Sequence, residues 1–129
     1  MVDTHSALWY LSDDSALSGR AAAVLDETTS AGQPIYLPAI CLVEAIYLCE
    51  KGKIPVSALD RLLRVIEEPD PRFVVAALDT VIAMSVRNIP RADVPDLPDR
   101  VIAATAVALG VPLVTKDRRI RGARVETIW

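Results

Sequence analysis

Short apolar runs alternate with longer segments of helical periodicity along the whole chain. The runs expected to form strands are Met1–Val2, Ile35–Leu37, Phe73–Val75, Pro112–Thr115 and Arg124–Ile128. Runs of this kind are typical of parallel strands, because helices bury such a sheet on both faces and also connect one strand to the next. The pattern therefore predicts an α/β fold of three layers, in which a parallel central sheet is flanked by helices.

Proline, glycine and capping residues divide the rest of the chain into helices. The expected helices cover residues 6–11, 19–30, 39–51, 57–67, 79–88 and 97–109. Ser18 and Ser57 are expected to be N-caps, and Gly110 is expected to end the last helix. A length of 129 residues suits one domain, so we expect the whole chain to form a single domain.

The sequence shows no signal for membrane insertion or secretion. A transmembrane helix needs roughly 18 consecutive apolar residues, and no stretch of the chain is that long and free of charge. The first residues, Met-Val-Asp-Thr-His, lack the basic and apolar regions of a secretory signal. We therefore expect a cytoplasmic protein that does not bind membranes.

Carboxylates occur within two helices that are otherwise strongly apolar. Glu44 is the single charged residue in the run 39–48, and Asp96 and Asp99 open the helix 97–109. Burying a lone carboxylate is costly, so each of these needs water, a polar partner or a metal ion. The alternatives are a solvent-exposed stripe for Glu44, and helix capping or interaction with the helix dipole for the two aspartates.

Two further aspartates follow expected strands directly. Asp3 comes after the first apolar run, and Asp117 comes two residues after the strand that ends at Thr115. In parallel α/β sheets, ligands bind at the carboxyl ends of the strands, so both aspartates are expected at the functional edge. The alternative is that each one satisfies backbone N–H groups in a loop.

The four acids Asp3, Glu44, Asp99 and Asp117 are the candidate catalytic residues. Gathered at one sheet edge, they would repel each other and require a divalent cation. Oxygen ligands favour Mg²⁺ or Mn²⁺, whereas a single histidine and the lack of a Cys-x-x-Cys motif give zinc little support. Such a site suits hydrolysis of a phosphodiester bond by metal-activated water.

A basic segment near the C-terminus offers contacts for phosphate groups. Its candidate residues are Lys116, Arg118, Arg119, Arg121 and Arg124, and Arg100 beside Asp99 is either a phosphate ligand or a structural counter-charge. The alternative is a solvated surface strand and loop. The net charge of −3 argues against strong nonspecific binding to nucleic acid. No aromatic residues interleave with the basic ones, so base stacking is not expected.

Taken together, these residues resemble the PIN-domain ribonucleases, and in particular the VapC-type toxins of toxin–antitoxin pairs. The matching segments are Val2-Asp3-Thr4-His5-Ser6-Ala7-Leu8-Trp9, Leu42-Val43-Glu44, Asp96-Leu97-Pro98-Asp99-Arg100-Val101-Ile102-Ala103-Ala104-Thr105-Ala106 and Pro112-Leu113-Val114-Thr115-Lys116-Asp117. They occur in the order typical of the family and extend over nearly the whole chain.

The resemblance implies a PIN-like sandwich, an acidic pocket for Mg²⁺ or Mn²⁺, and endonucleolytic cleavage of RNA. It also implies a homodimer that a cognate antitoxin protein neutralises. Asp3 and Asp99 correspond to direct metal ligands, with Glu44, Asp117 and Asp96 as further candidates. Thr4 and Thr115 correspond to hydroxyl positions that orient the carboxylates, and His5 to a supporting residue.

The first strand departs from the family pattern, because only Met1 and Val2 precede Asp3. Either further residues precede this sequence or the strand is truncated, and a truncated strand would let Asp3 move. Two alternatives to the toxin reading are a PIN-fold binding module that is catalytically weak or inactive, and a housekeeping RNA-processing nuclease. A small-molecule phosphatase is disfavoured, because Asp3 is not followed by the Asp-x-Asp pattern that such enzymes use.

Overall fold

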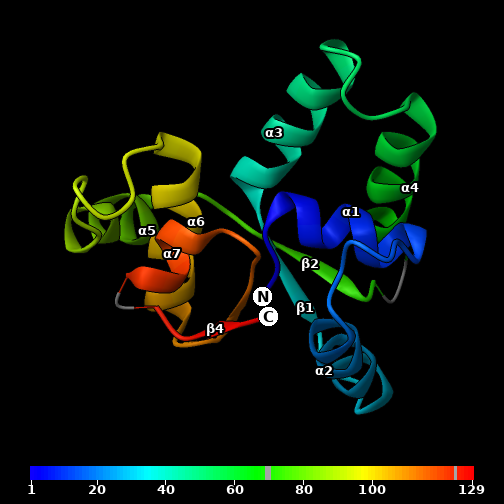
Figure 1. The fold of residues 1–129 in the computed structure, drawn as a ribbon, viewed down its shortest axis with the longest axis horizontal. Helices are drawn as coiled ribbons and strands as arrows, with labels where there is room; N and C mark the ends of the chain where they lie inside the picture. The colour runs from blue at the N-terminus through cyan, green and yellow to red at the C-terminus, as the bar shows by residue number, and fades with distance from the viewer. Residues whose placement is uncertain (69–70, 124) are drawn as a thin grey trace.

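A computed structural model describes residues 1–68, 71–123 and 125–129 (Figure 1). Helices and short strands alternate along the chain. In chain order they are α1 Thr4–Ser12, α2 Gly19–Ser30, β1 Ile35–Pro38, α3 Ala39–Glu50, α4 Val56–Glu67, β2 Phe73–Ala76, α5 Thr80–Ser85, the 3₁₀ helix η1 Val86–Asn88, α6 Leu97–Leu109, β3 Leu113–Val114, α7 Arg118–Gly122 and β4 Thr127–Ile128.

The backbone of Val2 joins two pairs of parallel strands into one sheet. Strand β1 pairs with β2, and β3 pairs with β4. The amide of Val2 donates to the carbonyl of Tyr36 in β1 at 3.0 Å, and Val2 forms a parallel bridge with Val114 in β3. Asp3 and Met1 complete this bridge through hydrogen bonds to Val114 of 3.2 and 2.9 Å. The resulting order across the sheet is β2, β1, Val2, β3 and β4.

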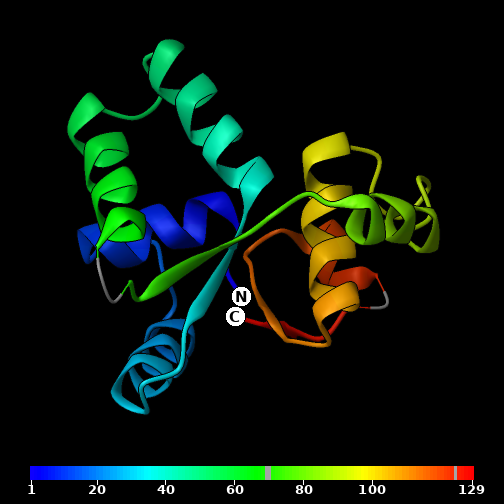
Figure 2. The same ribbon diagram turned by 180° about the vertical axis from the view of Figure 1, so that it is seen from behind.

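Helices lie on both sides of these strands, as the two opposite views show (Figures 1 and 2). The helices α1 to α4 gather on one side, and α5, α6 and α7 gather on the other. The predicted parallel sheet with flanking helices is therefore confirmed. Among the described residues, no helix is both long enough and apolar enough to span a bilayer.

Several helix boundaries follow from local sequence signals. Ser18 caps α2 by accepting from the amide of Ala21, and Gly110 ends α6 with a φ of +64°, a conformation that glycine adopts without strain. The predicted N-cap of α4 is wrong by two residues, because Pro55 occupies this position and Ser57 lies inside the helix. The ring of a proline fixes its φ angle at a value suited to the start of a helix, and proline has no backbone N–H that would need an acceptor.

The basic segment after β3 contains a helix that the sequence did not predict. The alternative to phosphate contact was a solvated surface strand and loop, but residues Arg118–Gly122 form the short helix α7. The final strand is shorter than predicted and begins at Thr127. Arg124 and the predicted loop residues Pro69 and Asp70 lie outside the described residues.

The core packs around the central strands. Val2, Leu37, Leu113 and Phe73 are all at most 1% exposed, and they belong to one continuous apolar cluster. Because Val2 is fully buried and bonded on both edges, the short N-terminal segment is not loose. Asp3 therefore starts from a fixed backbone position.

We predict that truncation of Val2 to alanine destabilises the protein far more than the same change at an exposed valine. Val2→Ala removes two fully buried methyl groups and leaves a cavity in the apolar core, which costs about 2 kcal/mol. Val56→Ala, at a side chain that is 64% exposed, changes stability by less than about 0.5 kcal/mol. Urea unfolding of both variants measures the difference, and equal losses would contradict the central placement of Val2.

Candidate active site

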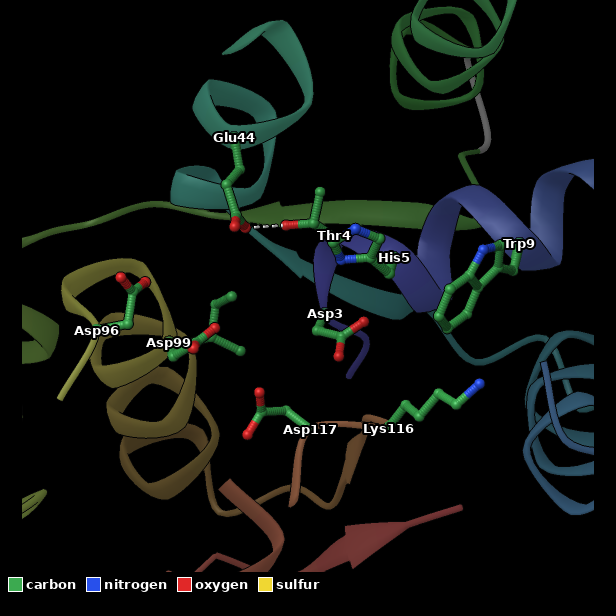
Figure 3. A pocket seen from close by; sticks show the side chains of 10 residues that line it. Asp3, Thr4, His5, Trp9, Glu44, Asp96, Asp99, Lys116 and Asp117 are labelled. Carbon is green, nitrogen blue, oxygen red and sulfur yellow. Dashed lines mark hydrogen bonds between the residues drawn. The ribbon is translucent and has the colours of Figure 1, made fainter. Parts of the chain in front are cut away.

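Five acidic side chains surround a pocket at the carboxyl ends of the central strands. Val2 has β1 on one side in the sheet and β3 on the other. The first half of the chain therefore adds strands in one direction from Val2 and the second half in the opposite direction. Ligand sites of open α/β sheets form at such reversals. The pocket has a volume of about 470 Å³ (Figure 3). It is lined by Asp3, Thr4, His5, Trp9, Glu44, Asp96, Asp99, Ile102, Lys116 and Asp117.

Asp3 and Asp117 are held in place as helix N-caps. Asp3 Oδ1 accepts from the amide of Ser6 at 2.7 Å at the start of α1. Asp117 Oδ1 accepts from the amides of Arg119 and Ile120 at 2.7 and 3.1 Å at the start of α7. The alternative to a role in a site was that each aspartate satisfies backbone N–H groups in a loop. Each of the two instead binds the N–H groups at a helix start and also lines the pocket.

Glu44 reaches the pocket from α3, where it is half-buried. Its carboxylate accepts a hydrogen bond from the hydroxyl of Thr4, which is itself buried in the first turn of α1. The predicted need for a polar partner is therefore met by a side chain 40 positions away in sequence. Thr4 fixes one carboxylate oxygen of Glu44 next to Asp3.

Thr115 has a matching place on the other wall. It is fully buried, and its hydroxyl accepts from the backbone amide of Asp117 at 3.0 Å. This bond fixes the turn from β3 into α7. Thr4 and Thr115 thus position an acid on opposite sides of the pocket.

Asp96 and Asp99 approach from the start of α6 (Figure 3). Asp96 occupies the N-cap, but its side chain makes no capping hydrogen bond. Burial raises the pKa of Asp99 from 3.8 to about 7, and neighbouring carboxylates add to this rise. In decreasing order of effect, these carboxylates belong to Asp117, Asp96, Glu44 and Asp3. The pocket therefore concentrates negative charge that its own residues do not compensate.

The carboxylates surround the pocket, but their side chains are not close enough together to bind one metal ion. Within residues 1–68, 71–123 and 125–129, no three His, Cys, Asp or Glu side chains are arranged to hold a metal ion as they stand. Like charges favour rotamers that spread apart, and Figure 3 shows the side chains of Asp3, Asp99 and Asp117 around an open space. Rotation of these side chains on the same backbone is what coordination would require.

The predicted basic residues separate into two groups. Lys116 lines the pocket, and the exposed residues Arg118, Arg119 and Arg121 lie on α7 beside it. Arg100 does not line the pocket. Its guanidinium donates to the carbonyls of Val86 and Ile89 over distances of 2.9 to 3.1 Å. Arg100 therefore ties α6 to η1, which favours the structural alternative over phosphate contact.

Three aromatic rings adjoin the pocket. The sequence indicated a supporting role for His5 and none for Trp9 and Trp129. His5 and Trp9 line it, and Trp129 packs edge-on against Trp9 at 6.0 Å between ring centroids. His5 and Trp9 lie four residues apart on α1, so their spacing predicts a shared helix face. The approach of Trp129 is a tertiary contact that no local pattern could reveal.

Comparison with known proteins agrees with this architecture. A family model of the PIN domain matches residues 1–125, and the chain therefore belongs to the PIN domain family. It is similar to ribonuclease VapC22 of Mycobacterium tuberculosis, with 26% identity over 132 residues that cover 100% of this chain and 97% of that protein. It also resembles the crystal structure of VapBC2 from Rickettsia felis bound to a DNA fragment from their promoter. That likeness has a TM-score of 0.73 at 16% identity and covers 99% of this chain and 96% of that one.

The raised pKa of Asp99 predicts how stability depends on pH in metal-free buffer. Between about pH 4 and pH 7 the folded protein holds a proton on Asp99 that the unfolded chain has lost, so stability falls as the pH rises through this range. Asp99→Asn keeps a neutral side chain and removes this contribution. We therefore expect the Asn variant to gain stability relative to the parent as the pH rises.

Thermal melting of both proteins across this pH range, with Asp60→Asn on the exposed face of α4 as the control, measures the effect. If the difference in melting temperature between Asp99→Asn and the parent stays constant with pH, the raised pKa of Asp99 is contradicted.

Proposed function

We propose that this chain is a single-domain, metal-dependent endoribonuclease that acts as the toxin of a toxin–antitoxin pair. The observation that carries the proposal is the pocket in which five carboxylates meet at the reversal point of the sheet. Membership of the PIN domain family and the similarity to ribonuclease VapC22 support the same reaction class. The substrate in this proposal is RNA, and the bond cleaved is a phosphodiester.

The donor chemistry of the pocket fits Mg²⁺ or Mn²⁺. The acidic side chains and the Thr4 hydroxyl offer hard oxygen ligands, which these ions prefer. Burial and then the neighbouring carboxylates raise the pKa of Asp99, and a bound cation would favour the charged form of this side chain. When bound, such an ion supplies an activated water molecule and stabilises charge on the scissile phosphate. Asp3 and Asp99 are the proposed direct ligands, with Glu44, Asp96 and Asp117 completing the set.

The residues of this chain then position the reacting groups. Thr4 holds Glu44 in one rotamer through its hydroxyl, so that the second oxygen of that carboxylate faces the pocket as a ligand or an acceptor for water. Thr115 holds the backbone of Asp117, whose capping bonds use Oδ1. Glu44 and Asp117 are thus oriented by hydrogen bonds before substrate binds, which lowers the entropic cost of assembling the site.

Substrate phosphates are proposed to contact the basic side chains beside the pocket. Lys116 lies on its rim, and the exposed Arg118, Arg119 and Arg121 project from α7. These residues give a local positive strip in a chain whose net charge is −3. Binding that depends on this strip weakens as salt increases.

The proposed antitoxin and second copy of the chain would cover apolar surface. Helix α3 exposes Val43, Ile46 and Tyr47, and each of these side chains is more than 40% exposed. Apolar side chains gathered on one helix face mark protein interaction sites more often than isolated ones do. The VapBC2 structure is itself a complex of a toxin-like chain with its partner, and the same kind of assembly is proposed here.

We expect the purified protein to cleave RNA with Mn²⁺ or Mg²⁺ and to lose this activity in EDTA. Asp99→Asn removes a proposed ligand and lowers the cleavage rate at least about 100-fold. Asp60→Asn on α4 keeps parental activity, because this exposed acid lies outside the pocket. Gel analysis of labelled RNA gives the rates. Equal cleavage by Asp99→Asn and the parent would show that the site assignment is wrong.

Thr4 provides a more selective test of the site. Thr4→Val keeps the shape of the buried side chain but removes the hydroxyl that binds Glu44, so Mn²⁺ affinity and cleavage fall about 10-fold to 100-fold. Thr4→Ser restores the hydroxyl and most of the activity. Calorimetric titration with Mn²⁺ separates affinity from rate, and a Val variant with parental affinity contradicts the proposed role. A parent protein that binds no Mn²⁺ would instead favour the non-catalytic binding module.

A further inference from the structure

A cluster of three aromatic rings and one lysine extends from the acidic pocket along one side of the molecule. His5 stacks at a tilt on Trp9, with 5.5 Å between ring centroids, and Trp9 meets Trp129 edge-on at 6.0 Å. The ammonium of Lys116 lies over both indoles, 5.4 Å from the centroid of Trp9 and 5.7 Å from that of Trp129. We call His5, Trp9, Lys116 and Trp129 the aromatic cluster.

The aromatic cluster adjoins the acidic pocket. His5, Trp9 and Lys116 line the same pocket as the five acids. In Figure 3 the ring of His5 lies between Thr4 and Trp9, and the side chain of Lys116 extends away from Asp117 toward Trp9. The cluster therefore begins beside Asp3 and Thr4 and leads outward from them. A nucleic acid whose phosphate reached the acids would pass a neighbouring base across these rings.

We propose that the aromatic cluster is a stacking platform for an unpaired RNA base next to the scissile phosphate. The proposal rests on the proposed nuclease function and adds to it a binding site for one base of the substrate, formed by His5, Trp9, Lys116 and Trp129. The indole of Trp9 receives the base, and Lys116 moves from the ring face to the adjoining phosphate. Stacking on an aromatic ring needs an unpaired base, because a base within a duplex is already stacked on both faces.

The charge of the protein supports a contribution from stacking. A chain with net charge −3 and five acids around its pocket gains little from nonspecific attraction to phosphate. Stacking is independent of net charge and tolerates any base, since every base has a π face. The tryptophans also satisfy two requirements of such a platform: each is only partly buried, and each packs against a neighbour that fixes the plane of its ring.

This arrangement changes the expectation from sequence. Base stacking was not expected, because no aromatic residue interleaves with the basic segment. The structure supplies the aromatic rings from α1 and from the last residue, Trp129, on either side of Lys116. A lysine and its aromatic partners are thus brought together by the fold and not by local sequence.

Intrinsic fluorescence offers a direct test, because the only two tryptophans of the sequence are both in the aromatic cluster. The Asp99→Asn protein, in buffer without divalent ions, is titrated with a short oligoadenylate. An abasic oligonucleotide of equal length and a duplex RNA are the matched probes. We expect the oligoadenylate to quench the fluorescence and the two other probes to leave it nearly unchanged. Equal quenching by the abasic probe would overturn the proposal.

Variants of Trp9 test the contribution to cleavage. In the otherwise unchanged protein, Trp9→Leu raises KM for single-stranded RNA about 10-fold with little change in kcat, which corresponds to the loss of one stacked base. Trp9→Phe keeps a ring and restores most of the affinity, whereas a purely structural role for the indole would lower kcat and thermal stability in both variants. The control is Tyr36→Leu, which removes a half-buried aromatic ring on β1 that does not line the acidic pocket, and leaves KM unchanged.

The two proposals fail in different ways. Cleavage of RNA by the parent together with an unaltered KM in Trp9→Leu overturns the stacking platform and leaves the nuclease standing. Base-dependent quenching without any Mn²⁺-dependent cleavage supports the platform and overturns the nuclease.

Discussion

The short N-terminal segment around Val2 joins the two halves of the sheet and places the first acid of the pocket. Val2 fills the central place in the sheet, and its neighbours hydrogen-bond to β3 while its own amide bonds to β1. No other contact joins the β1–β2 pair to the β3–β4 pair by strand hydrogen bonds in the part of the chain that the structure describes. The same segment leads directly into Asp3, so the link that unites the sheet also aims the first acid at the pocket.

Concentrating five carboxylates in one pocket opposes folding, and local hydrogen bonds offset part of this cost. Asp3 and Asp117 are stabilised by the amides at the starts of α1 and α7, where the helix dipole favours negative charge. Glu44 is stabilised by the Thr4 hydroxyl. Asp99 has no comparable bond among the described residues, and burial, followed by the neighbouring carboxylates, raises its pKa to about 7. Asp99 therefore bears part of the cost of placing these acids together.

Sequence reasoning reached the parts of this structure that local signals encode. The α/β fold, the helices α2 and α6, and the grouping of Asp3, Glu44, Asp99 and Asp117 follow from capping residues, periodicity and the position of strand ends. It missed α7, because a helix of five residues has too little periodicity to detect and is started by the cap at Asp117. It could not find the bonds of Arg100 to the carbonyls of Val86 and Ile89, since these depend on how α6 packs against η1.

The segment that follows β3 places three different kinds of side chain around one pocket. Asp117 adopts an extended backbone, in which successive side chains point in opposite directions. Thr115 faces inward and is fully buried, Lys116 faces outward to the tryptophans, and Asp117 turns toward the acids. Three consecutive residues therefore supply a supporting hydroxyl, a positive charge and a carboxylate. A shift of one position along this segment would exchange the buried hydroxyl with the lysine and remove all three roles together, so the register of β3 beside Val2 controls the site as well as the fold.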